Sequence, residues 1–391
     1  MAMKISKAAQ SVEPSLSRQL FNLAKEYRNV IDLTLGDPDL LPSSSIRSAA
    51  CEAIVSGKTR YSANAGLPSL RNAIAKCFLT EYGIEIDAES EIIVTVGGME
   101  ALFLAFACLL DHGDEVIVLA PYYVNYIQMI KMWGATPIIL NSKEEDGFLV
   151  SLDSIENAIT DKTIAIVVNS PCNPTGAVAD ADFLQALADL AVRHDLTVVS
   201  DEVYRTLIYD GVSCPSIFTM PGMRERTVVV NSVSKRFSMT GYRLGYAVAP
   251  SLLIDNMIVM QENIVACAPL PSQYAAQAAY ELNEKDTSIK EAFEERRKVL
   301  CDALAKVPGI RFVKPDGAFY LFVNVSGTGL DGLQFAYELL KTEQVAVVPG
   351  ITYGSEYRDY IRIAYTLEPP LLEEAANRID RFVRLCDFKA E

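Results

Sequence analysis

Polar residues follow four of the apolar, strand-like runs in this sequence. Lys235 follows TVVVNSVS, Asp201 ends LTVVS, Asn173 opens an NPTG turn after TIAIVVNSP, and Gly97 and Gly98 end EIIVTV just before a helix pattern. Free backbone N–H groups and the helix dipole favour an anion at a glycine-lined helix start. An amine, a carboxylate, an amide and an anion site together indicate one cofactor with several distinct functional groups.

The elements that must position these residues are strands that alternate with helix patterns. Runs rich in Val and Ile recur at 91–96, 115–121, 163–171, 196–204, 227–232 and 242–250. This alternation predicts a mostly parallel sheet wrapped by helices, because apolar runs without two-residue alternation are typical of strands covered on both faces. Ligands of such sheets gather at the carboxyl ends of the strands. We therefore expect the four groups of polar residues to share one edge.

From about Asp286 the pattern changes. A charged helical stretch at 289–304 precedes shorter strand patterns at 310–315, 318–325, 345–350 and 360–366 and a closing helix at 371–386. This order predicts a second, smaller α+β domain. We interpret the charges in 289–304 as a solvent-facing helix surface.

Composition excludes several classes of protein. Half of the 391 residues are apolar and 22% are charged, which is typical of a compact globular chain. The net charge of −15 repels phosphate backbones and anionic lipid, so we expect neither nucleic acid nor a membrane as a partner. No apolar run is long enough for a bilayer span, and the N-terminus lacks a secretory apolar region. We expect a cytoplasmic protein.

Cysteine and histidine spacing argues against a metal site. The eight cysteines form no C-x-x-C pair, and neither His112 nor His194 has a second ligand nearby. We expect no metal ion and no disulfide framework.

Two short motifs match other chemistries but lack the companion residues. The run GTGLDG at 327–332 fits the dinucleotide-binding pattern, yet the next strand ends in Pro349-Gly350 and not in an acid for the ribose. Ser232–Lys235 fits the S-x-x-K motif of serine acyl enzymes, without S-D-N or K-T-G. A glycine-rich surface loop and a lysine at a strand end are the plainer interpretations.

Nine segments in a fixed order give a specific resemblance. The chain resembles the fold-type I pyridoxal-phosphate aminotransferases of class I/II, particularly the subgroup with bacterial aspartate aminotransferases, from about residue 12 to 382. The segments are IDLTLGDPD, YSANAGLPSLR, TVGGMEALF, PYYVNY, NSPCNPTGA, SDEVY, NSVSKRFSMTGYRLGY, GAFY and YIRIAYT. The resemblance implies an α/β enzyme that transfers amino groups with pyridoxal 5'-phosphate.

It also implies a division of the chain. Residues 1–45 would form an N-terminal arm and part of the small domain, 46–285 the large domain that binds pyridoxal phosphate, and 286–391 the small C-terminal domain. Tyr61 matches a tyrosine lent to the phosphate by a neighbouring subunit, so a homodimer with shared sites is expected.

Carried over by position, Lys235 resembles the lysine that holds the cofactor as a Schiff base and shuttles a proton. Asp201 resembles the carboxylate on the pyridine nitrogen. Tyr204 and Asn173 match partners of the phenolic oxygen, and Tyr123 matches the aromatic residue stacked on the ring.

The remaining positions match the phosphate and substrate sites. Arg362 matches the arginine that binds the substrate α-carboxylate, helped by Asn173 and the backbone at Gly36. The matches to the phosphate cup and its surroundings are Gly97, Gly98, Met99, Ser232, Arg243 and Tyr61.

The sequence departs from dicarboxylate-specific relatives at two positions. A lysine after the two glycines is replaced by Met99, and an arginine from the partner is replaced by Asn263. A buried anionic side chain without a cation is unfavourable by several kcal/mol. We therefore expect a neutral or broad side-chain pocket, with 2-oxoglutarate as the acceptor. Arg18 could supply the missing positive charge, so aspartate stays open as an amino donor.

Three alternatives stay open at this point. A C–S β-lyase could use the same Lys235, Asn173 and Arg362. A non-enzymatic regulator could keep the fold, although intact Lys235, Asp201 and Arg243 argue against it. An oxidoreductase would depend on the glycine run at 327–332.

Overall fold

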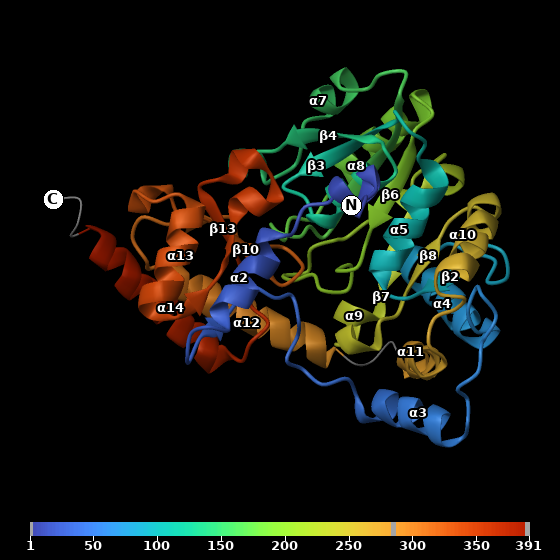
Figure 1. Ribbon diagram of the computed structural model, residues 1–391, viewed down its shortest axis with the longest axis horizontal. Helices are drawn as coiled ribbons and strands as arrows, with labels where there is room; N and C mark the ends of the chain where they lie inside the picture. The colour runs from blue at the N-terminus through green and yellow to red at the C-terminus, as the bar shows by residue number, and fades with distance from the viewer. Residues whose placement is uncertain (1–2, 283–286, 388–391) are drawn as a thin grey trace.

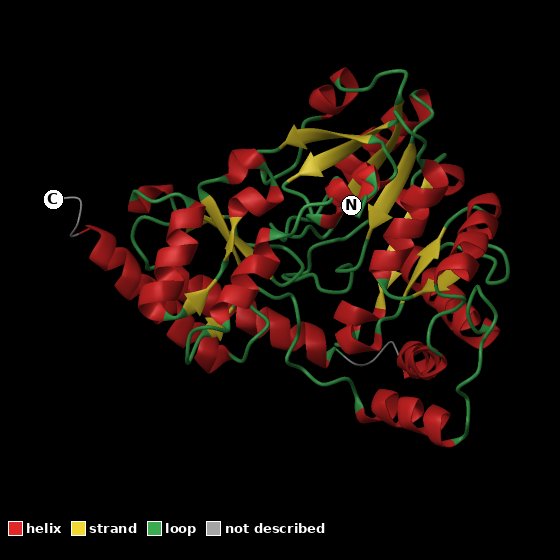
Figure 2. Ribbon diagram, viewed as in Figure 1, coloured by secondary structure: helices red, strands yellow, loops and turns green. Residues whose placement is uncertain are grey.

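The computed structural model describes residues 3–282 and 287–387. They form a larger body built on a seven-stranded sheet and a smaller body built on a four-stranded sheet (Figure 1). In Figure 2 the strands fall into these two groups, with helices around each. The α/β class with a mostly parallel central sheet is confirmed.

The large sheet is parallel except for one strand. Its strands in spatial order are β2 (Ile92–Thr95), β8 (Gly245–Val248), β7 (Thr227–Ser232), β6 (Thr197–Asp201), β5 (Thr163–Asn169), β3 (Glu115–Ala120) and β4 (Thr136–Asn141). Only β8 runs against its neighbours. The carboxyl ends of β2, β5, β6 and β7 therefore share an edge, as their sequences predict.

Helices cover both faces of this sheet, and side-chain alternation explains why. In β5, Ala165 and Val167 pack in one buried cluster with α5 and α6, whereas Ile166 and Val168 pack in another with α8. Strands buried on both sides need apolar residues at every position. The helices of the large body are α3 (Ser44–Val55), α4 (Pro68–Tyr82), α5 (Gly98–Leu109), α6 (Asn125–Met132), α7 (Leu152–Asn157), α8 (Ala181–Arg193), α9 (Val233–Arg236), α10 (Ser251–Ile264) and α11 (Leu270–Leu282).

The small body combines the two ends of the chain. Its antiparallel sheet has the order β12, β13, β10 and β9, and the N-terminal β1 pairs with β11 beside it. The bounds of its elements are α2 (Leu16–Ala24), β1 (Ile31–Asp32), α12 (Ser288–Leu304), β9 (Arg311–Phe312), β10 (Tyr320–Asn324), α13 (Gly332–Glu343), β11 (Val345–Ala346), β12 (Val348–Pro349), β13 (Tyr360–Ala364) and α14 (Pro369–Asp387), whereas α1 (Lys7–Gln10) contacts α6 of the large body. The division at 45 stays a prediction, and the boundary at 285 lies outside the described residues.

One element and one surface differ from expectation. The edge strand β4 carries Pro137, which hides a strand pattern in the sequence because proline is tolerated only at edges.

The interpretation of 289–304 as a wholly solvent-facing charged surface is wrong at two positions. Arg296 and Arg297 are 3% and 2% exposed and pair with Asp39 and Asp210.

At the end of the glycine run 327–332, the start of α13 lies very close to the backbone of β13. A Cβ at Gly332 would lie 1.9 Å from the carbonyl oxygen of Tyr360 in β13, so α13 can start there only with glycine. Asp331 and Gln334 cap the helix reciprocally. Within residues 3–282 and 287–387, no helix has the length and apolar character needed to cross a bilayer.

Candidate active site

A pocket of about 640 Å³ lies where the two bodies meet at the carboxyl edge of the large sheet. Residues 34–37 and side chains of the small body close it from one side, and strand ends of the large body close it from the other. The predicted site residues that line it are Gly36, Gly98, Met99, Tyr123, Asn173, Asp201, Tyr204, Ser232, Lys235, Arg243 and Arg362.

Strand ends place the central residues. Asp201 is the last residue of β6 and Ser232 the last residue of β7, and α9 follows β7 directly and carries Lys235. Asn173 lies four residues beyond β5, and its backbone N–H donates to Asn169 at 2.9 Å. Adjacent parallel strands thus bring the amine, the carboxylate and the amide into one pocket.

Asp201 is a buried acceptor. Its Oδ2 accepts a hydrogen bond from the Tyr126 hydroxyl at 2.5 Å, and Oδ1 accepts one from the Val203 N–H at 3.3 Å. Burial raises the pKa of Asp201 to about 6, although both hydrogen bonds oppose the rise. A cationic N–H donor would stabilise the ionised form of this carboxylate.

Lys235 is a half-buried residue that lines the pocket. Its Nζ donates to the carbonyl oxygen of Gly36 at 2.5 Å. Burial, together with the charges of Arg243 and Arg362, lowers its pKa to about 8, while Asp37 opposes that shift. The neutral, nucleophilic form of the amine is therefore accessible near physiological pH.

An anion cradle lies at the start of α5. Gly97 caps this helix with φ +81°, and a Cβ there would lie 2.4 Å from Nη2 of Arg243. Arg243 itself is held by a bond from Nη1 to the Thr240 carbonyl at 2.9 Å. Ser232 caps α9 by accepting the Ser234 N–H at 3.1 Å. A guanidinium and two helix starts favour a phosphate group here.

Arg362 is the cation on the opposite side of the pocket. It is 5% exposed, and its Nη1 and Nη2 donate to Asn173 Oδ1 at 3.1 Å and to the Thr34 carbonyl at 2.5 Å. Its Nε is buried without a hydrogen-bond partner among the described residues. A carboxylate ligand would satisfy this donor.

Aromatic side chains complete the pocket. The Tyr123 hydroxyl donates to Sδ of Met99 at 3.3 Å, and its ring meets Tyr126 edge-on with centroids 5.6 Å apart. The Tyr204 and Tyr320 hydroxyls lie 2.9 Å apart. The Tyr320 ring also lies 4.3 Å from the guanidinium carbon of Arg362.

Several residues in or next to the pocket are not among those predicted from the sequence. Tyr126 holds Asp201, Tyr320 lies between Tyr204 and Arg362, and Asn169 donates to the Asp201 carbonyl at 3.0 Å. Asn169 ends β5, so its place at a strand end was a usable signal. Tyr126 and Tyr320 reach the site through tertiary packing, which leaves no local pattern.

Tyr61 is not brought into this pocket. Its side chain is 86% exposed and is absent from the lining. Asn263 is also exposed, and its side chain donates to the Val259 carbonyl of its own helix at 2.8 Å. Arg18, in contrast, lines the pocket from α2.

The donor set fits pyridoxal phosphate. An amine with a lowered pKa suits an aldehyde, a buried carboxylate suits a protonated ring nitrogen, and the Gly97–Arg243 cradle suits a phosphate. The remaining buried donor, Nε of Arg362, suits the carboxylate of an amino acid.

Comparison with known proteins agrees with this chemistry. A family model described as aminotransferase class I and II matches residues 28–379. An aspartate aminotransferase of Pyrococcus abyssi is 39% identical over 385 residues, covering 98% of this chain and 99% of the relative. An aromatic-amino-acid aminotransferase 2 of Thermococcus litoralis is 37% identical with the same coverage. The structure of Thermus thermophilus aspartate aminotransferase with maleate matches with a TM-score of 0.92 and 37% identity, covering 97% of this chain and 100% of that one.

Proposed function

The chain belongs to the aminotransferase class I and II family, whose members depend on pyridoxal phosphate, and we propose that Lys235 carries this cofactor during transamination between an L-amino acid and a 2-oxo acid. The observation that supports this assignment best is the Lys235 amine in one pocket with Asp201 and Arg243. The relatives described above are named as aminotransferases, which favours transamination over β-elimination and over a non-enzymatic role.

Each residue has one task in this proposal. The bound cofactor supplies an electron-withdrawing ring that stabilises negative charge at the substrate α-carbon. Asp201 would accept a hydrogen bond from a protonated ring nitrogen, and Nζ of Lys235 would remove and return the α-proton of the substrate. Tyr204 and Asn173 would contact the phenolic oxygen, and Tyr123 would stack on the ring. The phosphate would be held by Gly97, Gly98, Ser232 and Arg243, with Met99 beside it.

The substrate carboxylate is bound from the small body. Arg362 lines the pocket together with Gly36 and with Asn173, whose Oδ1 accepts a hydrogen bond from Nη1 of Arg362. A bidentate guanidinium contact fixes the α-carbon relative to Lys235 and so aligns the proton that must move.

We propose a homodimer. Tyr61 is exposed and does not line the pocket of its own chain, which fits a role at the pocket of a second copy. Exposed apolar side chains also occur on α3 and α10, among them Val55 at 88% and Leu252 at 77%. A cytoplasmic location stays a prediction from the sequence.

Borohydride reduction tests the function directly. The protein with pyridoxal phosphate should show a visible absorbance band, and reduction followed by peptide mapping should place the label on Lys235. Lys235→Ala should lack the band and the activity, whereas Lys298→Ala, on the exposed side of α12, should keep both. A label on another lysine would overturn the proposal.

Substrate choice follows from Met99 and Arg18. We expect methionine, alanine and aromatic donors to react at least as fast as aspartate, because the glycine pair is followed by an uncharged side chain. Arg18 is a pocket cation that can bind the distal carboxylate of 2-oxoglutarate. Arg18→Ala should raise KM for 2-oxoglutarate about tenfold and leave neutral donors unchanged, since one charge-assisted contact is lost.

The control is Arg28→Ala, an exposed arginine just beyond the same helix. Two half-reactions, each followed by the spectral change of the cofactor, give KM for the amino donor and KM for 2-oxoglutarate. A strong preference for aspartate would refute the interpretation of Met99.

A further inference from the structure

Lys235 and Asp201 are each followed by a charged, largely buried residue that does not line the pocket. Arg236 has a side chain 12% exposed, and Glu202 has one 4% exposed. Neither residue lines the pocket, so the proposed chemistry does not use them directly. Buried charges are costly unless they are paired, and their partners show what these residues do.

Both charges are held by the same turn of one helix. The Tyr82 hydroxyl donates to Oε2 of Glu202 at 2.8 Å, and Nη2 of Arg236 donates to Oε1 of Glu81. Glu81 and Tyr82 are consecutive residues at the end of α4. This turn therefore contacts the immediate neighbours of both central residues of the site.

Arg205 connects the two contacts. Its Nη1 lies 3.6 Å from Oε2 of Glu202, and its Nη2 donates to the Glu81 carbonyl at 3.5 Å. Its guanidinium also lies 4.1 Å from the centre of the Tyr82 ring. The other oxygen of Glu202 accepts hydrogen bonds from Ser200 at 2.9 Å and Ser216 at 2.5 Å. The turn, Glu202 and Arg236 thus form one connected network.

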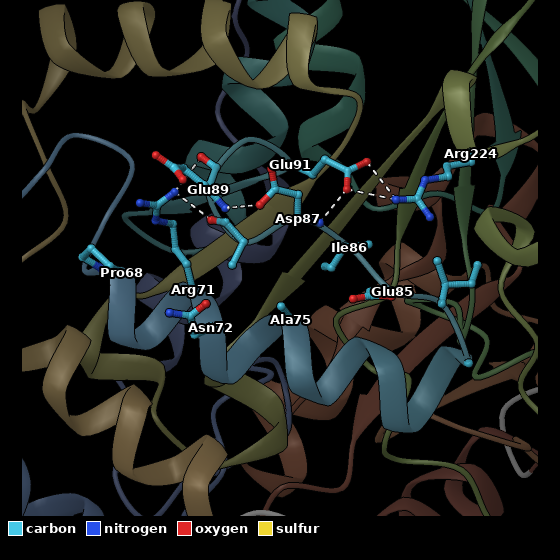
Figure 3. Close-up of a pocket in the computed structure, with 13 residues that line it drawn as sticks. Pro68, Arg71, Asn72, Ala75, Glu85, Ile86, Asp87, Glu89, Glu91 and Arg224 are labelled. Atoms are coloured by element: carbon cyan, nitrogen blue, oxygen red, sulfur yellow. Dashed lines mark hydrogen bonds and ion pairs between the residues drawn. The ribbon is translucent and has the colours of Figure 1, made fainter.

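The opposite end of α4 is fixed to the sheet. Figure 3 shows Arg71 reaching from the helix to the segment before β2, where Nη1 donates to the carbonyls of Ala88 at 2.7 Å and Glu89 at 2.8 Å. Glu91 of this segment pairs with Arg224 at 3.0 Å in the same view. Because these contacts hold both ends of α4, the helix keeps Glu81 and Tyr82 at a defined position relative to the sheet.

We propose that Glu81 and Tyr82 are positioning residues that set the spacing between the Lys235 amine and the Asp201 carboxylate through Arg236 and Glu202. This inference rests on the proposed function, in which the two groups act on opposite sides of one rigid ring. Their separation must then be held within a fraction of an ångström, and small displacements reduce rates strongly.

Two conservative substitutions test the inference. Tyr82→Phe removes the hydroxyl but keeps the ring stacked on Phe78 at 4.1 Å, and Glu81→Gln removes the charge that faces Arg236. Thr80→Ala is the matched control, because its exposed hydroxyl donates to the Lys76 carbonyl within the same helix and has no other hydrogen bond among the described residues.

The readouts are the Kd of pyridoxal phosphate for the cofactor-free protein, measured by equilibrium dialysis, and kcat and KM of the amino-acid half-reaction. Tyr82→Phe and Glu81→Gln should each raise Kd about threefold or more and lower kcat about tenfold, with KM within about twofold. Thr80→Ala should match the parent in all three.

A merely structural network predicts a different result. The melting temperature would fall while Kd and kcat of the folded protein matched the control, and that outcome would overturn the inference. If Tyr82→Phe does not fold, Glu81→Gln alone decides, because it keeps the shape of the side chain and removes only the charge that faces Arg236. Failure of the parent to bind the cofactor would refute the proposed function, whereas normal binding in parent and variants alike would refute only the role of α4.

Discussion

At the scale of single residues, the charges around Lys235 predict how cofactor loading depends on pH. The neutral amine attacks the aldehyde, and burial with Arg243 and Arg362 lowers the pKa of this amine to about 8. The neutral fraction therefore rises with pH through 8 and then saturates. The rate at which the visible band develops after mixing cofactor-free protein with pyridoxal phosphate should level off above about pH 9.

Removal of Asp37 should shift this profile in a known direction. Its negative charge raises the pKa of Lys235, so Asp37→Asn should lower that pKa and move the plateau to lower pH. Asp153→Asn, on α7 and outside the pocket lining, should leave the profile unchanged. A rate that still climbs toward pH 10.5 would contradict the burial of the amine described here.

At the scale of elements, the start of α13 shows what its glycine run does. Gly332→Ala should destabilise the protein by about 3 kcal/mol, because the new Cβ would meet the Tyr360 carbonyl at 1.9 Å and force α13 from β13. Gly329→Ala should be milder, at about 1 kcal/mol, since only its φ of +76° opposes a side chain and nothing lies within 4 Å. Urea unfolding measures both, and equal losses would refute the packing role.

The strands and their contacts show how much of the fold and of the site could be predicted from the sequence. Strands such as β5 and β6 contain apolar runs without two-residue alternation, at 164–168 and 198–199, so their type and the edge they share could be predicted from the local pattern. The edge strand β4 lacks that signal because it contains Pro137 and is partly exposed. Tyr126, Tyr320 and Tyr82 act through contacts with residues 75, 116 and 120 positions away. Such contacts depend on packing between elements, which no local periodicity encodes.

At the scale of the whole molecule, the position of Tyr61 predicts sites shared between two chains. Its exposed side chain lies on the segment between α3 and α4. A second copy related by a two-fold axis would place each Tyr61 at the pocket of the other chain. Sedimentation should therefore give twice the chain mass.

Mixing two defective variants provides the sharper test of the shared site. Lys235→Ala retains Tyr61 but cannot hold the cofactor. Tyr61→Ala retains Lys235 but lacks the hydroxyl that Tyr61 contributes to the pocket of the partner. In a mixed dimer, one pocket combines Lys235 of one chain with Tyr61 of the other and is native, while the second lacks both. Random pairing of equal amounts makes half of the dimers mixed, so about a quarter of all sites should bind pyridoxal phosphate with native affinity. Dialysis at cofactor concentrations below the Kd of Tyr61→Ala would count these sites, and their absence in a mixture that does exchange subunits would show that Tyr61 serves no partner.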